Sequence, residues 1–142
     1  MFKKLLLIGL FILCPQLVHA QTWLADSKIA VKSYISVNNI TAVAVKPSSG
    51  TVYSIDAFNN GASLAYVKLY AAVLPYTCGT GTPFARYLIP YGASSSGGGF
   101  NVSNINGDAY STGIVMCITT GIADNDTGAP TANQFIVNVH IK

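Results

Sequence analysis

The sequence contains no glutamate, and charged residues make up only 9% of it. Its five acidic residues are all aspartates, set against eight lysines and arginines. No block of basic residues is present that could neutralise a run of nucleic acid phosphates, so nucleic acid is excluded as a partner. A surface with so little charge must be built from serine, threonine, asparagine and glycine. This composition is typical of exported β-proteins and of proteins that pack against copies of themselves.

Long apolar runs are equally scarce, and the one that occurs lies near the first residue. Two lysines precede an unbroken apolar run from Leu5 to Leu13, and residues of the kind that signal peptidase reads end the segment at Ala20. This pattern predicts a secretory signal peptide over residues 1–20, cut before Gln21. The run is too short to span a bilayer, and no later stretch could do so. We therefore expect an exported protein, periplasmic or extracellular, with no membrane span after cleavage.

Cysteine is also rare, with three residues in the chain. Cys14 lies in the predicted signal peptide. A lipoprotein anchor there is the alternative, but Leu13 stands where a small residue would be expected. Cys78 and Cys117 then remain, and an oxidising compartment favours one disulfide between them, with two buried thiols as the alternative. Beyond residue 20 the sequence has no CxxC motif and only one histidine, His140, so neither a thioredoxin-type pair nor a zinc site is expected.

Apolar residues recur with a period of two along most of the chain, which predicts strands. The clearest alternation, at the C-terminus, involves Phe135, Val137, Val139 and Ile141. Further strands are predicted over residues 29–37, 40–46, 50–58, 65–71, 84–90, 98–104 and 109–119. The segments between them are rich in turn-forming residues, and no amphipathic helix is evident. We therefore predict one all-β domain over residues 21–142, a single antiparallel β-sandwich, jelly-roll-like, with about eight strands.

The stretch Asp124-Asn125-Asp126 is the candidate metal site. Its side chains offer hard oxygen ligands of the kind that calcium prefers. The chain lacks the longer array and the terminal glutamate of an EF-hand, however, and Asp and Asn also stabilise turns through their own backbone. The turn interpretation is therefore favoured, and a loop calcium is the alternative. As catalytic acids these neighbours lack the cleft and the opposed environments that a hydrolytic carboxylate pair needs.

No other motif predicts catalysis. His140 lies on the polar face of the last predicted strand, and sequence spacing assembles no nucleophile and orienting residue around it. The glycine-rich stretch 92–100 lacks the GK[ST] ending of a phosphate-binding loop. We therefore predict no enzyme, no catalytic residue and no cofactor other than the calcium alternative.

Tyrosines are the remaining candidates for a binding surface. Tyr66 and Tyr70 should share one face of their strand, opposite the face that carries Val67. Tyr87 and Tyr91 lie in or beside loops. A tyrosine combines an apolar ring with a polar tip, which suits protein interfaces and sugar stacking alike. The alternative is that these rings only line the rim of a two-layer fold.

Several segments of the sequence resemble those of a known protein family. They are "SSGTVYSIDAFNNGASLAYVKLYAA", "GTGTPFARYLIP", "YSTGIVMCITTGIADNDTGAP" and "FIVNVHIK", between about residue 31 and the end. The chain is similar over this range to small, largely uncharacterised β-sandwich proteins of tailed phages and prophages, usually assigned to virion structure. The resemblance implies a structural role and offers no catalytic motif. The predicted signal peptide and the cysteine pair depart from that family, and they point to an exported bacterial relative or to a virus that assembles through the envelope.

Three functions follow from these patterns. The first is a non-enzymatic structural protein, virion-like or a fibre component, that contacts itself or other structural proteins. The second is a carbohydrate-binding module or adhesin that binds surface glycans through exposed tyrosines and a loop calcium. A pilus-like subunit is a variant of the second, in which a segment near residues 21–37 is donated to the next subunit. An enzyme is the third.

Overall fold

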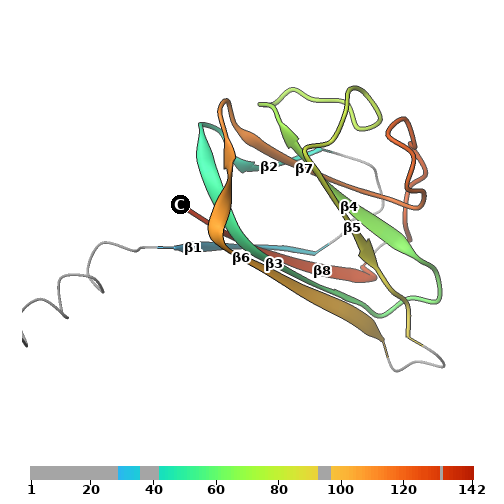
Figure 1. Cartoon of the computed structure of the whole chain (residues 1–142). Coiled ribbons are helices and arrows are strands. Elements are labelled where there is room, and N and C mark those ends of the chain that lie inside the picture. The colour runs from blue at the N-terminus through green and yellow to red at the C-terminus, as the bar shows by residue number, and fades with distance from the viewer. Residues whose placement is uncertain (1–28, 36–41, 93–96, 132) are drawn as a thin grey trace, which may run out of the picture.

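The computed structural model describes residues 29–35, 42–92, 97–131 and 133–142. These residues form eight strands in two antiparallel sheets and no helix (Figure 1). The predicted all-β antiparallel sandwich is therefore confirmed. No helix that could cross a membrane occurs in this part of the chain. The predicted signal peptide lies outside the described residues, as does most of the segment proposed for donation.

Four antiparallel pairs of strands make up the two sheets, with two pairs in each sheet (Figure 1). Sheet one contains, in spatial order, β1 (Ala30–Ile35), β8 (Phe135–Ile141), β3 (Gly50–Asn59) and β6 (Gly98–Tyr110). Sheet two contains β2 (Val43–Lys46), β7 (Ile114–Thr119), β4 (Ala65–Ala71) and β5 (Ala85–Ile89). The strands pair as in one long hairpin that has been rolled up, with the antiparallel pairs β1–β8, β2–β7, β3–β6 and β4–β5. This is the strand order of a jelly roll, the form of sandwich that the sequence predicts.

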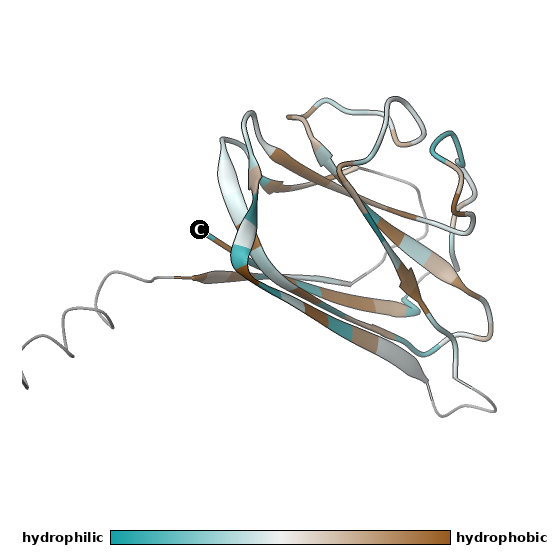
Figure 2. Ribbon diagram, viewed as in Figure 1, coloured by the Kyte–Doolittle hydropathy of each residue, from teal (hydrophilic) through white to brown (hydrophobic). Residues whose placement is uncertain are grey.

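The core lies between the sheets, because each strand points alternate side chains inward. The alternation of apolar and polar residues along both sheets is visible in Figure 2. On β8 the predicted inner face is confirmed, because all four residues assigned to it are buried: Phe135, Val137, Val139 and Ile141. They pack against inner-face residues of the other strands, among them Ile55, Val67, Leu69, Ile114 and Met116. Complete burial of one such aliphatic side chain stabilises a fold by about 1.5 to 3 kcal/mol.

The predicted strands differ from the observed ones mainly around residue 110. The strand predicted over 98–104 extends to Tyr110 as β6, and the strand predicted over 109–119 is wrong, because β7 begins only at Ile114. A Cβ atom on Gly113, in the turn between them, would lie 2.6 Å from a backbone oxygen, so the turn needs a glycine. β1 is an edge strand, and Val31 pairs with His140 on the outer face, where it is 54% exposed.

β6 is the longest strand and contains an irregular segment. Its pairing with β3 stops after Ser103 and resumes at Asp108. The side chain of Asn104 donates a hydrogen bond to Oδ1 of Asp108 over 2.9 Å, and Gly107 adopts a φ of +72°. The side chain of Ile105, at the centre of this segment, is 93% exposed. The segment is therefore a bulge fixed by its own polar contacts.

Candidate functional site

Two loops lie against the outer face of sheet two. The disulfide loop, residues 72–84, joins β4 to β5, and the Asp loop, residues 120–131, follows β7. Figure 2 shows that the tip of the Asp loop is hydrophilic. Both loops contact outward-facing side chains of β4, β5 and β7, as the pairs below show. The outer face of sheet two is thus partly covered, although Leu88 of β5 stays 46% exposed there.

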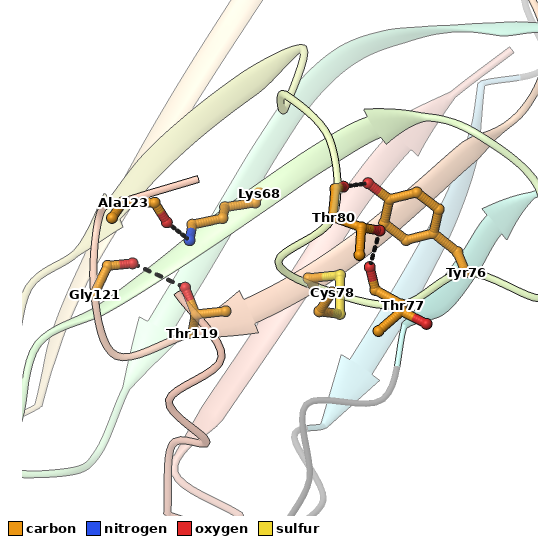
Figure 3. The surroundings of a disulfide bond; sticks show 9 residues. Lys68, Tyr76, Thr77, Cys78, Thr80, Thr119, Gly121 and Ala123 are labelled. Carbon is orange, nitrogen blue, oxygen red and sulfur yellow. Dashed lines mark hydrogen bonds between the residues drawn. A yellow bond between two sulfur atoms is a disulfide. The ribbon is translucent and has the colours of Figure 1, made fainter. Parts of the chain in front are cut away.

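The predicted disulfide joins Cys78 to Cys117, which are 39 positions apart (Figure 3). Cys117 lies on β7 beside Lys68 of β4, so its side chain points to the outer face of sheet two. Cys78 reaches it from the disulfide loop. Both cysteines are buried in a small second cluster with Ala42, Tyr70 and Val115. The bond contributes roughly 3 to 4 kcal/mol in the chain-entropy model, and the alternative of two thiols is wrong.

The disulfide loop is also held by polar contacts (Figure 3). The hydroxyl group of Tyr76 donates a hydrogen bond to the carbonyl oxygen of Thr80. The hydroxyl group of Thr80 donates in turn to the carbonyl oxygen of Thr77 over 2.6 Å. The ring centroids of Tyr76 and Tyr70 lie 4.8 Å apart, which adds an aromatic contact to sheet two. The loop is therefore a fixed cover for one end of this sheet.

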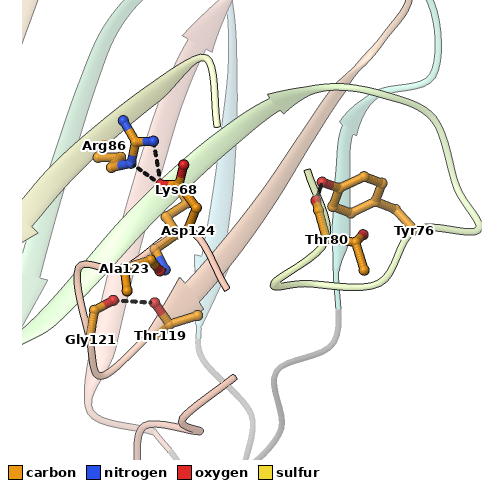
Figure 4. Close-up of polar contacts among 8 residues, drawn as sticks. All are labelled: Lys68, Tyr76, Thr80, Arg86, Thr119, Gly121, Ala123 and Asp124. Atoms are coloured by element: carbon orange, nitrogen blue, oxygen red, sulfur yellow. Dashed lines mark hydrogen bonds and ion pairs between the residues drawn. The ribbon is translucent and has the colours of Figure 1, made fainter. Parts of the chain in front are cut away.

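Lys68 is the buried charge that the sequence reasoning missed. It lies on the outer face of β4 between Tyr66 and Tyr70, and none of its side chain is exposed. Its Nζ donates a hydrogen bond to the carbonyl oxygen of Ala123 in the Asp loop, over 2.5 Å (Figure 4). Burial lowers the pKa of Lys68, against the opposing effect of the nearby aspartates Asp126 and Asp124. The alternation along β4 placed Lys68 outward, but only the overlying loop explains its burial.

The Asp loop has a second attachment, between Asp124 and β5 (Figure 4). Nε of Arg86 donates to Oδ1 of Asp124 over 2.8 Å, and Nη2 donates to the same oxygen. Each side chain is about a third or more exposed, so this pair contributes about 0.2 to 1 kcal/mol. Asp126 accepts a hydrogen bond from the amide of Gly128 over 2.9 Å, which is a turn contact.

These contacts bear on the calcium alternative at Asp124, Asn125 and Asp126. Both carboxylates have protein partners, and the geometry is that of a turn. Among the residues that the structure describes, no three His, Cys, Asp or Glu side chains form a group that could hold a metal. The geometry favours the turn interpretation, and calcium binding stays a prediction.

The four tyrosines singled out from the sequence do not form one surface. Tyr66 and Tyr70 share the outer face of β4 as predicted, but Tyr70 is only 2% exposed beneath the disulfide loop. Tyr87 pairs with Val67 and points to the inner side, where its ring stacks on Phe100 of β6 with centroids 5.7 Å apart. Tyr91 follows β5 and is exposed. Two of the four rings therefore act in packing.

The outer face of sheet one holds a polar cluster that was not predicted. Asp56 of β3 lies between two residues of β8. The side-chain amide of Asn138 donates to Oδ2 of Asp56 over 2.7 Å, and Nε2 of His140 lies 3.2 Å from Oδ1. Phe58 and Ile136, which are paired across the same two strands, lie next to this cluster. Alternation puts Asn138 and His140 on one face, but their contact with Asp56 depends on the register between β3 and β8.

Comparison with known proteins adds no relative. No family model matches the chain, and neither a curated protein nor a solved structure matches it. The resemblance to phage-encoded β-sandwich proteins therefore stays a prediction.

Proposed function

We propose that the protein is a non-enzymatic, exported structural component that assembles through sheet one with copies of itself or with other structural proteins. The observation that carries this proposal is the pair Phe58 and Ile136. They lie side by side on the outer face of sheet one, and each is 43% exposed. Val31 on β1 adds a third exposed apolar side chain to the same face. Contiguous exposed apolar residues are typical of interaction surfaces.

Two further features support this proposal. The buried disulfide is compatible with an oxidising compartment, such as the periplasm or the cell exterior. The jelly-roll strand order is used by viral capsid proteins, which assemble from many copies. The second point is an analogy at the level of the fold, since one fold supports many functions.

The test is the mass of the signal-free protein in solution, measured by size-exclusion chromatography with light scattering over a range of concentrations. We expect a discrete oligomer or a fibre whose mass is the same with calcium and with EDTA. A monomer at every concentration, alone and with other surface proteins of its source, would overturn the proposal.

Glycan binding is the second candidate, and the polar cluster on sheet one favours it. Asp56, Asn138 and His140 offer hydrogen-bond donors and acceptors beside the exposed ring of Phe58, a combination that suits a sugar. This surface replaces the predicted set of tyrosines. In a glycan-array screen, the variant Asp56→Ala should lose any binding, and Asp108→Ala on β6 should retain it. A wild-type protein that binds no glycan, or equal binding by both variants, would exclude this site.

A further inference from the structure

The four edge strands differ in charge. β1 and β6 are the edges of sheet one, and β2 and β5 are the edges of sheet two. An edge strand presents unpaired backbone groups, and proteins protect such edges with charged side chains. β1 carries Lys32, β2 carries Lys46 and β5 carries Arg86. The part of β6 that precedes the bulge, Gly98–Ser103, carries no charged residue. Asp108, the charged residue of β6, lies at the far end of the bulge, so Gly98–Ser103 is the longest uncharged stretch on the four edges.

The core is also incomplete along this edge. Val102 pairs with the buried residue Ile55, so its side chain points to the inner face, and yet it is 41% exposed. Phe100, which pairs with Ala57, is only partly buried even with the ring of Tyr87 stacked on it. Both side chains remain accessible because, among the residues that the structure describes, no strand pairs with β6 on its other side. A strand added to this edge would cover them.

We propose that two copies of the protein pair edge to edge through β6, antiparallel about a two-fold axis at Asn101, over Gly99–Ser103, so that Phe100 of one copy lies opposite Val102 of the other. Sheet one of each copy then becomes half of a continuous eight-stranded sheet. This inference deepens the proposed assembly role and rests on it. The partner is a second copy of this chain. The affinity comes from backbone hydrogen bonds and from contacts of Phe100 and Val102.

The charge pattern explains why the partner is the same strand. A two-fold axis brings identical segments together, so a charge in the paired segment lies near its own copy, and lies directly opposite it only on the axis. Like charges on neighbouring strands destabilise a strand pair. Self-pairing of β1, β2 or β5 would bring two lysines or two arginines near one another, whereas Gly99–Ser103 pairs with itself without this repulsion.

The bulge limits the length of this pairing. It begins at Asn104, directly after the uncharged segment, and it ends regular pairing with β3. Bulges bend a strand and interrupt its ladder. The ladder between copies therefore covers five residues on each side, or roughly 17 Å. A limited ladder favours a closed dimer over an open fibre along this edge.

A charge placed in the paired segment tests the inference. In the signal-free protein, Val102→Lys should weaken self-association about tenfold or more, because each lysine would replace an apolar contact with Phe100 of the other copy and would lie near the second lysine. Light scattering would then report a lower mass than for the wild-type protein at equal concentration. The matched control is Val73→Lys, the same substitution at a similarly exposed position in the disulfide loop, and it should leave the mass unchanged. Circular dichroism shows whether both variants are folded.

A cross-linking variant gives an independent test of pairing through β6. Asn101 lies near the middle of the proposed ladder, so Asn101→Cys should form a disulfide-linked dimer under mild oxidation, and Ser33→Cys on β1 should not. If the wild-type protein is a monomer at all concentrations, both this inference and the assembly role fail. If the wild-type protein is an oligomer that Val102→Lys leaves intact and Asn101→Cys does not link, the assembly role stands and pairing through β6 is wrong.

Discussion

Tyr110 lies at the end of β6 with its hydroxyl group buried. Among the described residues this oxygen has no hydrogen-bond partner, and burial raises the pKa of Tyr110. A buried polar group without a partner costs about 1 to 3 kcal/mol. The variant Tyr110→Phe keeps the ring that contacts Phe84 and removes that group. We expect its free energy of unfolding to be equal to or up to about 1 kcal/mol above that of the wild type.

Denaturant unfolding measures this difference, and Tyr34→Phe is the matched control. The hydroxyl group of Tyr34 donates to the carbonyl oxygen of Ala44 over 3.1 Å. Its removal should therefore lower the free energy of unfolding by about 1 kcal/mol. Equal losses in both variants would mean that the Tyr110 hydroxyl group is hydrogen-bonded in solution.

Lys68 predicts a dependence of stability on pH. Because burial lowers the pKa of its ammonium group below the ordinary 10.5, the folded protein releases this proton at a lower pH than the unfolded chain. Between the two pKa values the unfolded chain binds more protons, so the free energy of unfolding rises with pH. Relative to Lys68→Met, the wild-type protein should gain stability as the pH rises from neutral toward about 10.

The comparison with Lys68→Met removes the effect of the tyrosines, which titrate in both proteins. Urea unfolding at a series of pH values would measure the difference. Parallel profiles for the two proteins would contradict the burial of Lys68 beneath the Asp loop.

At the level of elements, one covalent bond joins the disulfide loop to sheet two. Replacing both Cys78 and Cys117 by serine should lower the free energy of unfolding by about 2 to 5 kcal/mol, because the unfolded chain is no longer constrained. Reducing agent should lower the stability of the wild type by a similar amount and leave the double variant unchanged. A wild-type protein whose unfolding is the same with and without reductant would refute this.

The contacts of the Asp loop predict that calcium does not change the thermal stability of the protein. Arg86 and the amide of Gly128 already hold Asp124 and Asp126, so calcium would have to displace these contacts. We expect the Tm to be equal in millimolar calcium and in EDTA. A bound ion at 100 times its Kd would stabilise the fold by about 2.7 kcal/mol, a shift that calorimetry would detect.

The strands were largely predictable, because alternation is a local property. It identified the buried face of β8 and the shared face of Tyr66 and Tyr70. It did not separate β6 from β7, since the turn at Gly113 lies inside an apolar stretch, and it could not show that Val31 lies on an edge. The cluster around Asp56 and the burial of Lys68 were missed for one reason: both depend on contacts between segments that lie far apart in sequence.

For the whole molecule, self-association links stability to concentration. If folded copies pair and unfolded chains do not, the Tm rises with protein concentration by mass action. We expect this rise for the wild type and for Val73→Lys, and a Tm that is independent of concentration for Val102→Lys. Differential scanning calorimetry at several concentrations would measure it. Equal slopes for all three proteins would argue against the edge of β6 as the interface.

The sandwich architecture could be predicted from the sequence, but the order of the strands in the two sheets could not. Many registers and pairings satisfy the same alternation of apolar and polar residues. The rolled hairpin is selected by the whole core, in which Val137 and Val139 of β8 contact residues of both sheets. That selection is not visible in any one segment.

The place of β8 has a consequence for the synthesis of the protein. β8 is the last strand to leave the ribosome, yet it lies between β1 and β3 within sheet one. Neither neighbour can complete its ladder before Ile141 has been translated, so the nascent chain cannot close its core early. An exported chain must stay unfolded until it has been translocated. The position of one strand thus defers folding until β8 has been translated, which is the behaviour that the proposed export requires.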